Sequence, residues 1–506
     1  MAHEPAEVPG LEEALSAIAA RPSGAVVLTS EQEEAVRSAL RSPLAVVSGG
    51  PGTGKTSIVV AILRAAVATG ASPASIALAA PTGKAADRMR RSVEAALSQV
   101  SEPGESDRAL AAALPRPMTL HRLLGYSPSR GGFAHGAENP LSERLVIVDE
   151  SSMIDVFLME RLVASLLPSA RVVLLGDAEQ LPSVAAGAVF RDLGRAARVP
   201  SAVLTKSHRM DPSRPEGFNI LTVAARINSG ELPRLVPGEV RDGTLLPADL
   251  SGLGVLGSLP PDPDALGGVF LHEPASPLDR ERFVDFWYEH RARGPSEVAR
   301  LATRTWPLED GLVERGAHGD LEVLFTHLER ARLLCVTRSA ARPTGVEAIN
   351  ASLHRRAADD RRASGALLLA GEPILVREND YERGLFNGDQ GVVLFTSSHG
   401  ERPAPSAVFR KDDGFVAHPI EAVRASVELG YATTVHKAQG SEHDQVALVL
   451  PETDSPRLLT REIVYTAITR ARRSVLVVGS PELLARAAAR RVERSTGIAE
   501  RMAREG

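Results

Sequence analysis

The chain has 506 residues, of which 43% are hydrophobic and 24% are charged, and its formal net charge is −5. This composition excludes an intrinsically disordered chain, and the length provides for about three domains. The single cysteine, Cys335, excludes a disulfide scaffold and cysteine-ligated zinc or iron–sulfur sites, and it is typical of a cytoplasmic protein. The net negative charge is not typical of a nucleic-acid-binding protein. If the protein binds DNA, the positive charge that does so must be confined to a groove.

The N-terminal segment has no pattern of a targeting sequence. Residues 1–10 are acidic and contain proline, unlike a signal peptide, and no apolar run is long enough to span a bilayer. We therefore predict a cytoplasmic protein with no membrane partner. Residues 1–24 are interpreted as a short stub, and Ser30 is the candidate N-cap of the helix that follows.

Residues 25–200 alternate short apolar strands with helical segments, a pattern typical of a parallel α/β sheet. Between the second and third strands, residues 124–141 are polar and rich in glycine, and we expect them to form a small projecting β-hairpin. The predicted strands are residues 44–47, 76–80, 145–148 and 171–175.

A complete P-loop follows the first of these strands, and a helix is predicted to leave it at residues 57–69. Its glycines let backbone N–H groups converge on a phosphate chain, and the helix N-terminus adds its dipole. Lys55 is expected to reach the β- and γ-phosphates and Thr56 to ligate Mg²⁺, so ATP and Mg²⁺ are the predicted cofactors. The predicted ATP-binding residues here are Gly49, Gly50, Pro51, Gly52, Thr53, Gly54, Lys55, Thr56 and Ser57.

Lysine usage supports this interpretation independently. Lysine should persist where a compact ammonium group cannot be replaced by a planar guanidinium. Lys55 lies in the P-loop, and Lys84 and Lys437 lie in other motif-like segments, whereas Lys411 is expected to lie in a solvated turn. The 58 basic residues include five lysines: Lys55, Lys84, Lys206, Lys411 and Lys437.

Two adjacent carboxylates, Asp149 and Glu150, end the third predicted strand. Asp149 can hold Mg²⁺ through water, while Glu150 can orient and deprotonate the attacking water. The alternative is an acidic surface pair after a buried strand, and the P-loop upstream favours the catalytic interpretation. After the next strand, Gln180 can sense the γ-phosphate, although a Gly-Asp turn in this place is common.

Residues 201–480 are predicted to form a second α/β domain with strands at 333–336, 446–450 and 475–478. Two insertions interrupt it. Residues 236–325 contain both tryptophans and have no assignable fold, whereas residues 366–428 are predicted to form a small β unit with an Asn387-Gly388 turn. Residues 481–506 are rich in arginine and alanine and are predicted to form a helical tail.

The second domain should supply positive charge to the developing phosphate charge, as arginine fingers do. Arg209, near the start of this block, and Arg470, at the end of a helix predicted from residue 461, are the candidates. With 53 arginines among the 58 basic residues, an isolated arginine on a solvated face is the competing interpretation.

Together these segments resemble RecD-like helicases of superfamily 1, the family of the RecD subunit of the bacterial RecBCD exonuclease. The resemblance covers about residues 28–235 and 330–480. Its segments are Gln32, residues 49–56, 80–86, 119–124, 148–155, 175–181, 385–389, 434–442 and 464–471.

The resemblance implies two RecA-like P-loop NTPase domains with parallel sheets, a strand-splitting pin at residues 124–141 and an SH3-like insert at residues 366–428. It also implies movement from 5′ to 3′ along DNA. Gln32 would contact adenine, and Arg209 and Arg470 would be the arginine fingers. The residues lining the path of single-stranded DNA would be Thr82, Thr119, His121, Thr434 and His436.

The chain departs from the family at its N-terminus. Members that work in the three-subunit complex carry a substantial N-terminal docking domain, whereas here the P-loop begins at residue 49. RecB-like and RecC-like subunits are therefore expected partners only if the protein works as a complex subunit, and a stand-alone helicase is the other expectation.

The function predicted is an ATP-dependent helicase and translocase on single-stranded and tailed duplex DNA, acting in double-strand-break repair and recombination. The alternatives are a DNA-binding ATP switch without productive unwinding and an RNA-remodelling enzyme. No nuclease activity is expected, because none of the five lysines has a carboxylate two residues before it, as an Asp/Glu-x-Lys nuclease motif requires.

Overall fold

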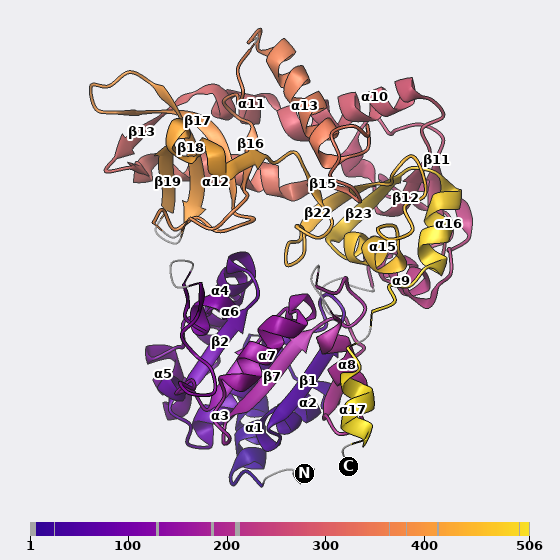
Figure 1. The fold of residues 1–506 in the computed structure, drawn as a ribbon. Helices are drawn as coiled ribbons and strands as arrows, with labels where there is room; N and C mark the ends of the chain where they lie inside the picture. Colours follow the sequence, from indigo (N-terminus) through magenta and orange to yellow (C-terminus); the bar gives the residue numbers. More distant parts are fainter. Residues whose placement is uncertain are drawn as a thin grey trace. The chain divides into compact units, whose positions relative to one another are not determined.

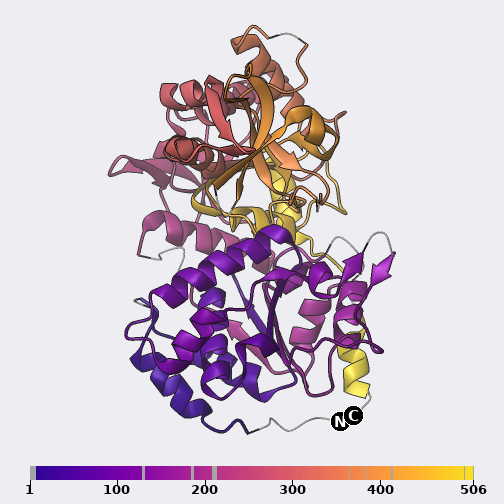
Figure 2. The ribbon, with the colours of Figure 1, turned by 90° about the vertical axis from the view of Figure 1, so that its left-hand side faces the viewer.

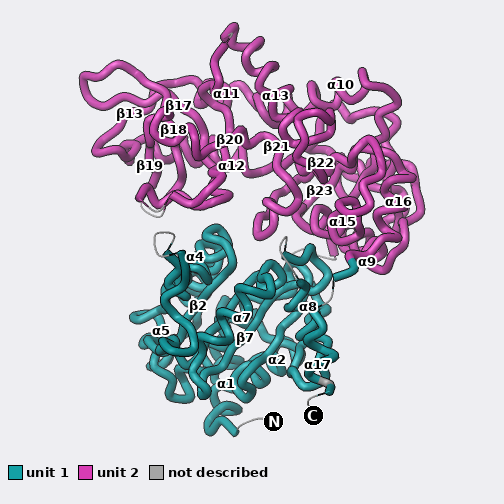
Figure 3. Tube along the Cα trace, viewed as in Figure 1, with its two compact units in different colours: residues 1–209, 493–506 teal, residues 210–492 magenta. Residues whose placement is uncertain are grey.

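The computed structural model describes residues 7–24, 26–127, 131–183, 187–207, 213–363, 365–380, 382–411, 414–494 and 496–504. The chain forms two compact units, shown in Figure 3. Unit 1 comprises residues 1–209 together with residues 493–506, and unit 2 comprises residues 210–492. The chain therefore enters unit 2 once and returns from it once.

Unit 1 is built on a sheet in which six described strands are all parallel, in the order β3-β2-β6-β7-β1-β8. The four predicted strands are present at its centre, where β1 pairs with β7 and β2 with β6. Two short edge strands complete it. The bounds are β1 (Leu44–Gly49), β2 (Ile76–Ala80), β3 (Met118–Thr119), β6 (Leu145–Val148), β7 (Arg171–Gly176) and β8 (Ser201–Leu204).

Helices cover both faces of this sheet, as Figures 1 and 2 show, so its central strands are apolar on both sides. Alternate residues point to opposite faces: Val47 packs with the first group of helices and Val46 with the second. The first group is α1 (Leu11–Ala20), α2 (Ser30–Arg41), α3 (Lys55–Ala68), α4 (Gly83–Ser98) and α5 (Glu105–Ala112). The second group is α6 (Leu120–Leu123), α7 (Val156–Ala164), α8 (Val189–Arg195) and α17 (Ile498–Arg504).

The N-terminal part of unit 1 differs from the prediction in two details. The segment interpreted as a stub contains α1, whose Leu11, Leu15 and Ile18 are buried in the first core. The predicted N-cap Ser30 is wrong, because Thr29 caps α2. Thr29 is extended, its side chain accepts from the Gln32 N–H, and the Gln32 side chain accepts from the Thr29 N–H, which completes a capping box.

The main sheet of unit 2 contains eight described strands in the order β10-β9-β11-β12-β23-β22-β15-β21. Only the pairing of β10 with β9 is antiparallel among them. Four of its strands lie in residues 235–272, almost all of which belong to the segment 236–325 that had no assignable fold. The bounds are β9 (Leu235–Arg241), β10 (Thr244–Pro247), β11 (Leu253–Leu256), β12 (Gly268–His272), β15 (Ala331–Cys335), β21 (Ala432–Thr434), β22 (His443–Val449) and β23 (Ala471–Val478).

Two groups of helices pack on this sheet. Helices α9 (Pro215–Ser229), α15 (Arg461–Ile468) and α16 (Pro481–Ala489) pack together, with α9 against β12 and β23. Helices α10 (Pro277–Trp287) and α13 (Val346–Asp360) share a second core with Phe270 and Leu476. A π-helical turn, Tyr288–Arg293, extends α10.

A second sheet in unit 2 closes on itself. β13 pairs with β14 and also with β17, so the ring runs β13-β14-β19-β18-β17 and back to β13. Trp306 and Phe415 are buried inside it together with residues of α11 (Ser296–Thr303) and α12 (His318–Arg330). The strands are β13 (Thr305–Glu309), β14 (Leu312–Val313), β16 (Pro373–Val376), β17 (Gln390–Ser398), β18 (Ala404–Lys411), β19 (Gly414–Pro419) and β20 (Val427–Leu429), and α14 (Ile420–Val423) lies between the last two.

This ring uses residues outside the insert predicted at 366–428. Strands β13 and β14 come from the preceding segment. β13 pairs with an edge of β17 that would otherwise be exposed, and Trp306 of β13 is buried. Gly388 has φ +90°, as a turn requires, but it lies in the longer loop between β16 and β17. Lys411 is not a solvated turn residue, since its Nζ lies 2.7 Å from Asp389 Oδ2 and donates to the Gly384 carbonyl.

The predicted hairpin and the predicted tail are each only partly as expected. In the hairpin, β4 (Tyr126–Ser127) pairs antiparallel with β5 (Gly132–Phe133), and the residues between Ser127 and Gly131 lie outside the described part. The tail is two separate helices, α16 in unit 2 and α17 in unit 1. In the described residues, no helix has the length and hydropathy needed to cross a membrane.

Candidate nucleotide and DNA site

The P-loop joins the buried strand β1 to the first turn of α3. Gly52 and Gly54 have φ values of +76° and +82°, which residues with a side chain rarely adopt, and Gly54 is the N-cap of α3. A Cβ at Gly49 would come 2.4 Å from Thr53 Oγ1, which itself donates to the Gly50 carbonyl at 2.9 Å. The loop is therefore a tight backbone cradle, and the N–H groups of the first turn of α3 have no partner within the helix.

Lys55 is the first residue of α3, and its side chain folds back onto the P-loop. Its Nζ donates to the carbonyls of Gly49 at 2.6 Å and Gly50 at 3.1 Å. The side chain is half-buried, so its ammonium group is placed beside the backbone that would hold a phosphate chain.

The predicted acidic pair lies directly after β6. Asp149 and Glu150 are 7% and 6% exposed, and the Glu150 N–H donates to Asp149 Oδ1 at 2.8 Å. Burial and the adjacent charge of Glu150 raise the pKa of Asp149, while the charges of Arg88 and Lys55 act to lower it. Glu150 has φ +52°, so the backbone turns at this residue, which precedes the short 3₁₀ turn Ser151–Met153.

Arg88 is a site residue that the sequence analysis missed. Arg88 lies in α4, and its Nη2 is 3.8 Å from Glu150 Oε1. The signal available was its spacing: Arg88 is four residues after Lys84, and residues four apart share one face of a helix. The resemblance quoted for this segment ended two residues earlier, at residue 86.

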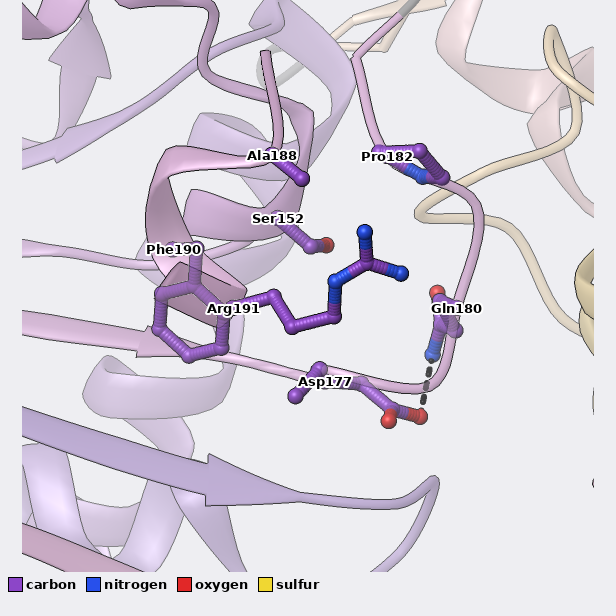
Figure 4. A pocket seen from close by; sticks show the side chains of 8 residues that line it. Ser152, Asp177, Gln180, Pro182, Ala188, Phe190 and Arg191 are labelled. Carbon is purple, nitrogen blue, oxygen red and sulfur yellow. Dashed lines mark hydrogen bonds between the residues drawn. The ribbon is translucent and has the colours of Figure 1, made fainter. Parts of the chain in front are cut away.

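Gln180 follows β7 in a turn organised by Asp177. Its Nε2 donates to Asp177 Oδ2 at 2.9 Å, and the Ala178 N–H donates to Ser48 Oγ, which ties this turn to the P-loop strand. Gln180 Oε1 and Ser152 Oγ are buried and have no hydrogen-bond partner among the described protein atoms. Figure 4 shows both side chains around a small pocket, with the Arg191 side chain pointing between them.

Gln32 is 2% exposed, and its amide is engaged within unit 1. Its Oε1 accepts from the Thr29 N–H at 2.9 Å, and its Nε2 donates to the Thr53 carbonyl at 3.1 Å. The structure therefore shows Gln32 joining the start of α2 to the P-loop.

The predicted magnesium ligands fit that ion in their chemistry. The Thr56 hydroxyl and the Asp149 carboxylate are hard oxygen donors, which Mg²⁺ prefers, and this ion commonly takes its other ligands from waters and substrate phosphates. Among the residues that the structure describes, no cluster of three or more His, Cys, Asp or Glu side chains could hold a metal alone. The donor set thus suits an ion that arrives with a nucleotide.

The predicted DNA residues of unit 1 lie at the carboxyl ends of the neighbouring strands β2 and β3. Thr82 caps α4 and Thr119 caps α6, and each hydroxyl oxygen accepts a backbone N–H at 3.2 Å. Because the oxygen accepts, the hydroxyl proton can still donate to a phosphate. His121 packs against the rings of Tyr126 and Phe133, and burial lowers its pKa.

In unit 2, Thr434 ends β21 and its Oγ1 accepts from the Lys437 N–H at 3.2 Å. Lys437 Nζ forms an ion pair with Glu428 at 2.7 Å. His436, the residue before Lys437, is half-buried. These residues begin the loop that leads into β22.

Arg470 is 3% exposed and lies two residues after the end of α15, next to its C-cap Thr469. Its Nε donates to the Thr466 carbonyl at 3.2 Å and its Nη1 to the Ser441 carbonyl at 3.3 Å. The guanidinium is thus held beside the loop that starts at Thr434. Arg209, the other predicted finger, lies outside the described residues.

Family models match both units of the chain. The model described as an AAA domain matches residues 32–186, and the UvrD-like helicase C-terminal domain matches residues 429–478. The RecBCD enzyme subunit RecD of Mycobacterium tuberculosis is 36% identical over 489 residues, which are 94% of this chain and 73% of that protein. The chain belongs to the RecD family.

Two further relatives and one solved structure also match most of this chain. The RecBCD enzyme subunit RecD of Mycolicibacterium smegmatis is 36% identical, and the match covers 97% of this chain and 79% of that one. The ATP-dependent RecD2 DNA helicase of Deinococcus radiodurans is 31% identical over 94% of this chain and 52% of its own length. A solved Pif1 helicase from Candida albicans is 14% identical, with a TM-score of 0.46 over 95% of this chain and all of that one.

The AAA-domain match lies in unit 1, and the UvrD-like helicase C-terminal match lies in unit 2. The chain is an ATP-dependent helicase of the RecD family. The P-loop, the acidic pair and Gln180 all lie within the AAA match, and Thr434, His436 and Arg470 lie within the helicase C-terminal match.

Proposed function

We propose that this RecD-family helicase uses ATP and Mg²⁺ to move from 5′ to 3′ along single-stranded DNA and to unwind duplex DNA, in double-strand-break repair and recombination. The observation that carries the proposal is one edge of the unit 1 sheet. The P-loop, Asp149 and Gln180 follow β1, β6 and β7, and the hydroxyls of Thr82 and Thr119 follow β2 and β3 at the same edge.

The assigned roles follow from this arrangement. The P-loop backbone, Lys55 and Ser57 would hold the phosphates, and Thr56 and Asp149 would hold Mg²⁺, which supplies charge neutralisation at the phosphates. Glu150, kept beside the Arg88 guanidinium, would orient and deprotonate the attacking water. Gln180 would sense the γ-phosphate, and Gln32 would contact adenine.

Positive charge in trans would come from Arg470 and Arg209, stabilising charge that develops in the transition state. Thr82, Thr119, His121, Thr434 and His436 would line the DNA path. Hydroxyl and imidazole groups contact the sugar-phosphate backbone without reading bases, which suits a motor that moves through any sequence.

Two smaller elements have proposed mechanical roles. The β4–β5 hairpin, with its exposed Tyr126, would be the pin that splits base pairs. The closed ring of β13, β14, β19, β18 and β17 would be the SH3-like insert, and five strands closing a small barrel support that assignment. RecB-like and RecC-like subunits are proposed partners, because the RecD relatives at 36% identity are named as subunits of the RecBCD enzyme.

A paired assay tests the function. ATP hydrolysis and strand separation are measured on duplexes that carry either a 5′ or a 3′ single-stranded tail. We expect hydrolysis to rise with single-stranded DNA and unwinding to occur only with the 5′ tail. Hydrolysis without unwinding on either substrate would instead indicate an ATP-dependent switch, and stronger stimulation by RNA would indicate an RNA substrate.

A further inference from the structure

Three aromatic rings gather where the β4–β5 hairpin meets α6. The ring centroid of Tyr126 lies 5.1 Å from that of Phe133 and 5.5 Å from that of His121, and the centroids of Phe133 and His121 are 5.8 Å apart. At these distances each ring contacts the other two. We call His121, Tyr126 and Phe133 the aromatic cluster, and all three residues belong to unit 1.

The backbone fixes the position of the aromatic cluster. Tyr126 and Phe133 are opposite each other in the β4–β5 pair, so their side chains lie on the same face of the hairpin. The Ala134 N–H donates to the carbonyl of Gly125 at 3.2 Å, and Gly125 directly follows the C-cap of α6. The base of the hairpin is therefore tied to the short helix that carries His121.

The two hairpin rings of the aromatic cluster differ in their burial. Phe133 is half-buried and packs against the core that contains Leu120 of α6. The Arg161 guanidinium of α7 lies 5.8 Å from the centroid of the Phe133 ring. Tyr126, in contrast, is 41% exposed. Phe133 is therefore the anchored ring of the pair, and Tyr126 is the ring with a surface open to solvent.

The protonation of His121 favours a nucleobase over a phosphate as the ligand of these rings. Burial lowers the pKa of His121, although the charge of Asp155 acts to raise it, so the imidazole is neutral at pH 7. A neutral imidazole adds no positive charge with which to attract a phosphate. Every base, however, has a π-face that can stack on an aromatic side chain, and proteins that bind single strands use such rings.

We propose that the aromatic cluster stacks one base of single-stranded DNA on the open surface of Tyr126. The hairpin then holds the strand in addition to separating base pairs. This inference rests on the proposed function, in which His121 lies on the DNA path and the β4–β5 hairpin is the pin. Stacking tolerates any base, which suits a motor that moves through any sequence.

The test compares full-length Tyr126→Ala, Tyr126→Leu, Tyr126→Phe and Phe157→Ala proteins. Phe157 of α7 is the matched control, because its ring is 72% exposed and is not part of the cluster. Affinity for a fluorescently labelled single-stranded oligonucleotide is measured at several salt concentrations. Tyr126→Ala and Tyr126→Leu should weaken binding about tenfold, as the loss of one stacked base does, while Tyr126→Phe and Phe157→Ala should stay within about twofold of wild type. The salt dependence should not change, because no phosphate contact is lost.

A strand without bases separates stacking from a merely structural role of the ring. On an oligonucleotide of the same length made of stable abasic nucleotides, the wild type and Tyr126→Ala should differ in affinity by less than about twofold, because no base is left to stack. A tenfold loss on the abasic strand as well would mean that Tyr126 only supports the hairpin, and it would overturn the inference. Wild-type affinity of Tyr126→Leu, or an altered salt dependence in Tyr126→Ala, would also overturn it.

Failure of the proposed function is distinguishable from failure of this inference. If the wild-type protein does not bind single-stranded DNA and shows no DNA-stimulated ATP hydrolysis, the proposed function itself is wrong. If the wild type binds the strand and hydrolyses ATP in response to it, while Tyr126→Ala binds the base-containing oligonucleotide as tightly as wild type, only the stacking of a base on Tyr126 is refuted.

Discussion

Glu150 stands in a left-handed backbone conformation that few residues with a side chain adopt, next to a carboxylate whose own pKa is raised by burial. Strained backbone of this kind costs of the order of 1–3 kcal/mol and persists where the surrounding structure fixes it. Here the Met153 N–H donates to the Glu150 carbonyl, and Ser151 Oγ donates to the carbonyl of Val148 at the end of β6. We propose that this turn keeps the carboxylate that would bind Mg²⁺ apart from the one that would activate water.

Glu150→Gln should therefore still bind ATP but lose turnover by at least about 100-fold, since the amide cannot accept the proton of the attacking water. The checks are a nucleotide-binding titration and a single-turnover hydrolysis assay. Lys55→Ala is the comparison, because it should lose hydrolysis through uncompensated phosphate charge. Substantial ATPase activity in purified Glu150→Gln protein would refute the assignment of the catalytic carboxylate.

Arg88→Ala should lower kcat for ATP about tenfold with little change in melting temperature, because its charge lies beside the carboxylate that activates water. Arg91→Ala, on the same helix, is the matched control: its ion pair with Asp87 is exposed, and such pairs contribute little. Steady-state hydrolysis measured from pH 6 to 9 would show the difference. Equal activity of the two variants would mean that Arg88, like Arg91, is a surface residue without a role in hydrolysis.

The P-loop and the acidic pair could be predicted from sequence because their chemistry is encoded in consecutive residues. The spacing of Arg88 from Lys84 indicates a shared helix face, but not the contact of Arg88 with Glu150, which forms only when β2 and β6 pair. The amide of Gln32 gives the converse case. Its position was predictable, but its engagement by Thr29 and the P-loop carbonyl depends on how α2 packs.

At the scale of elements, α5 is held to α3 by a buried ion pair. Arg64 and Asp107 are 4% and 6% exposed and make two hydrogen bonds, at 2.7 and 3.2 Å. Burial acts to raise the pKa of Asp107, but hydrogen bonds from Arg64 and from the Gly104 N–H outweigh it, so the pKa lies below its ordinary value.

Asp107→Asn should destabilise the protein by about 3 kcal/mol at pH 7, because it leaves a buried guanidinium without its counter-charge. A carboxyl whose pKa is lowered on folding contributes its stability above the unfolded value of about 4 and loses it as pH falls through the folded pKa. Urea unfolding of both proteins at several pH values would show the difference shrinking toward low pH. A difference independent of pH would mean that the charge is not what matters.

The β4–β5 hairpin has two described strand residues on each side, and its Tyr126 and Phe133 rings pack against each other and against His121. Shortening residues 126–139 should abolish unwinding of a tailed duplex while leaving DNA-stimulated ATP hydrolysis largely intact. A pin acts mechanically, whereas hydrolysis needs the sheet edge. Glu138→Ala, an exposed substitution in the same segment, should leave both activities unchanged. Equal losses of both activities in a folded deletion variant would count against a pin.

Strands with clear apolar runs, such as β6 and β7, were predictable, whereas the strands of residues 235–272 were not. β9 and β11 contain proline or glycine and short apolar stretches, and they become strands because a neighbouring parallel strand pairs with them. β13 and β14 are a similar case. Their pairing partners β17 and β19 lie about 80–100 residues later, beyond the reach of a local pattern.

At the scale of the whole molecule, the expected chemistry is ATP hydrolysis without DNA cleavage. This expectation rests on the sequence, in which none of the five lysines has a carboxylate two residues before it, and on the proposal that Asp149 and Glu150 act at the nucleotide. Purified protein incubated with labelled DNA and Mg²⁺ should therefore give full-length strands. Cleavage that co-purifies with the chain and survives Lys55→Ala would contradict this.

The discontinuous make-up of unit 1 also has a consequence for how the protein is synthesised. Domains generally fold as units from the N-terminus while the ribosome is still working. Here Ile498, Ala499 and Met502 complete an apolar core whose other members, such as Phe190, emerge about 300 residues earlier. This apolar face of the first unit stays uncovered until the ribosome has synthesised unit 2 and α17. We therefore expect chaperones to protect the face during synthesis.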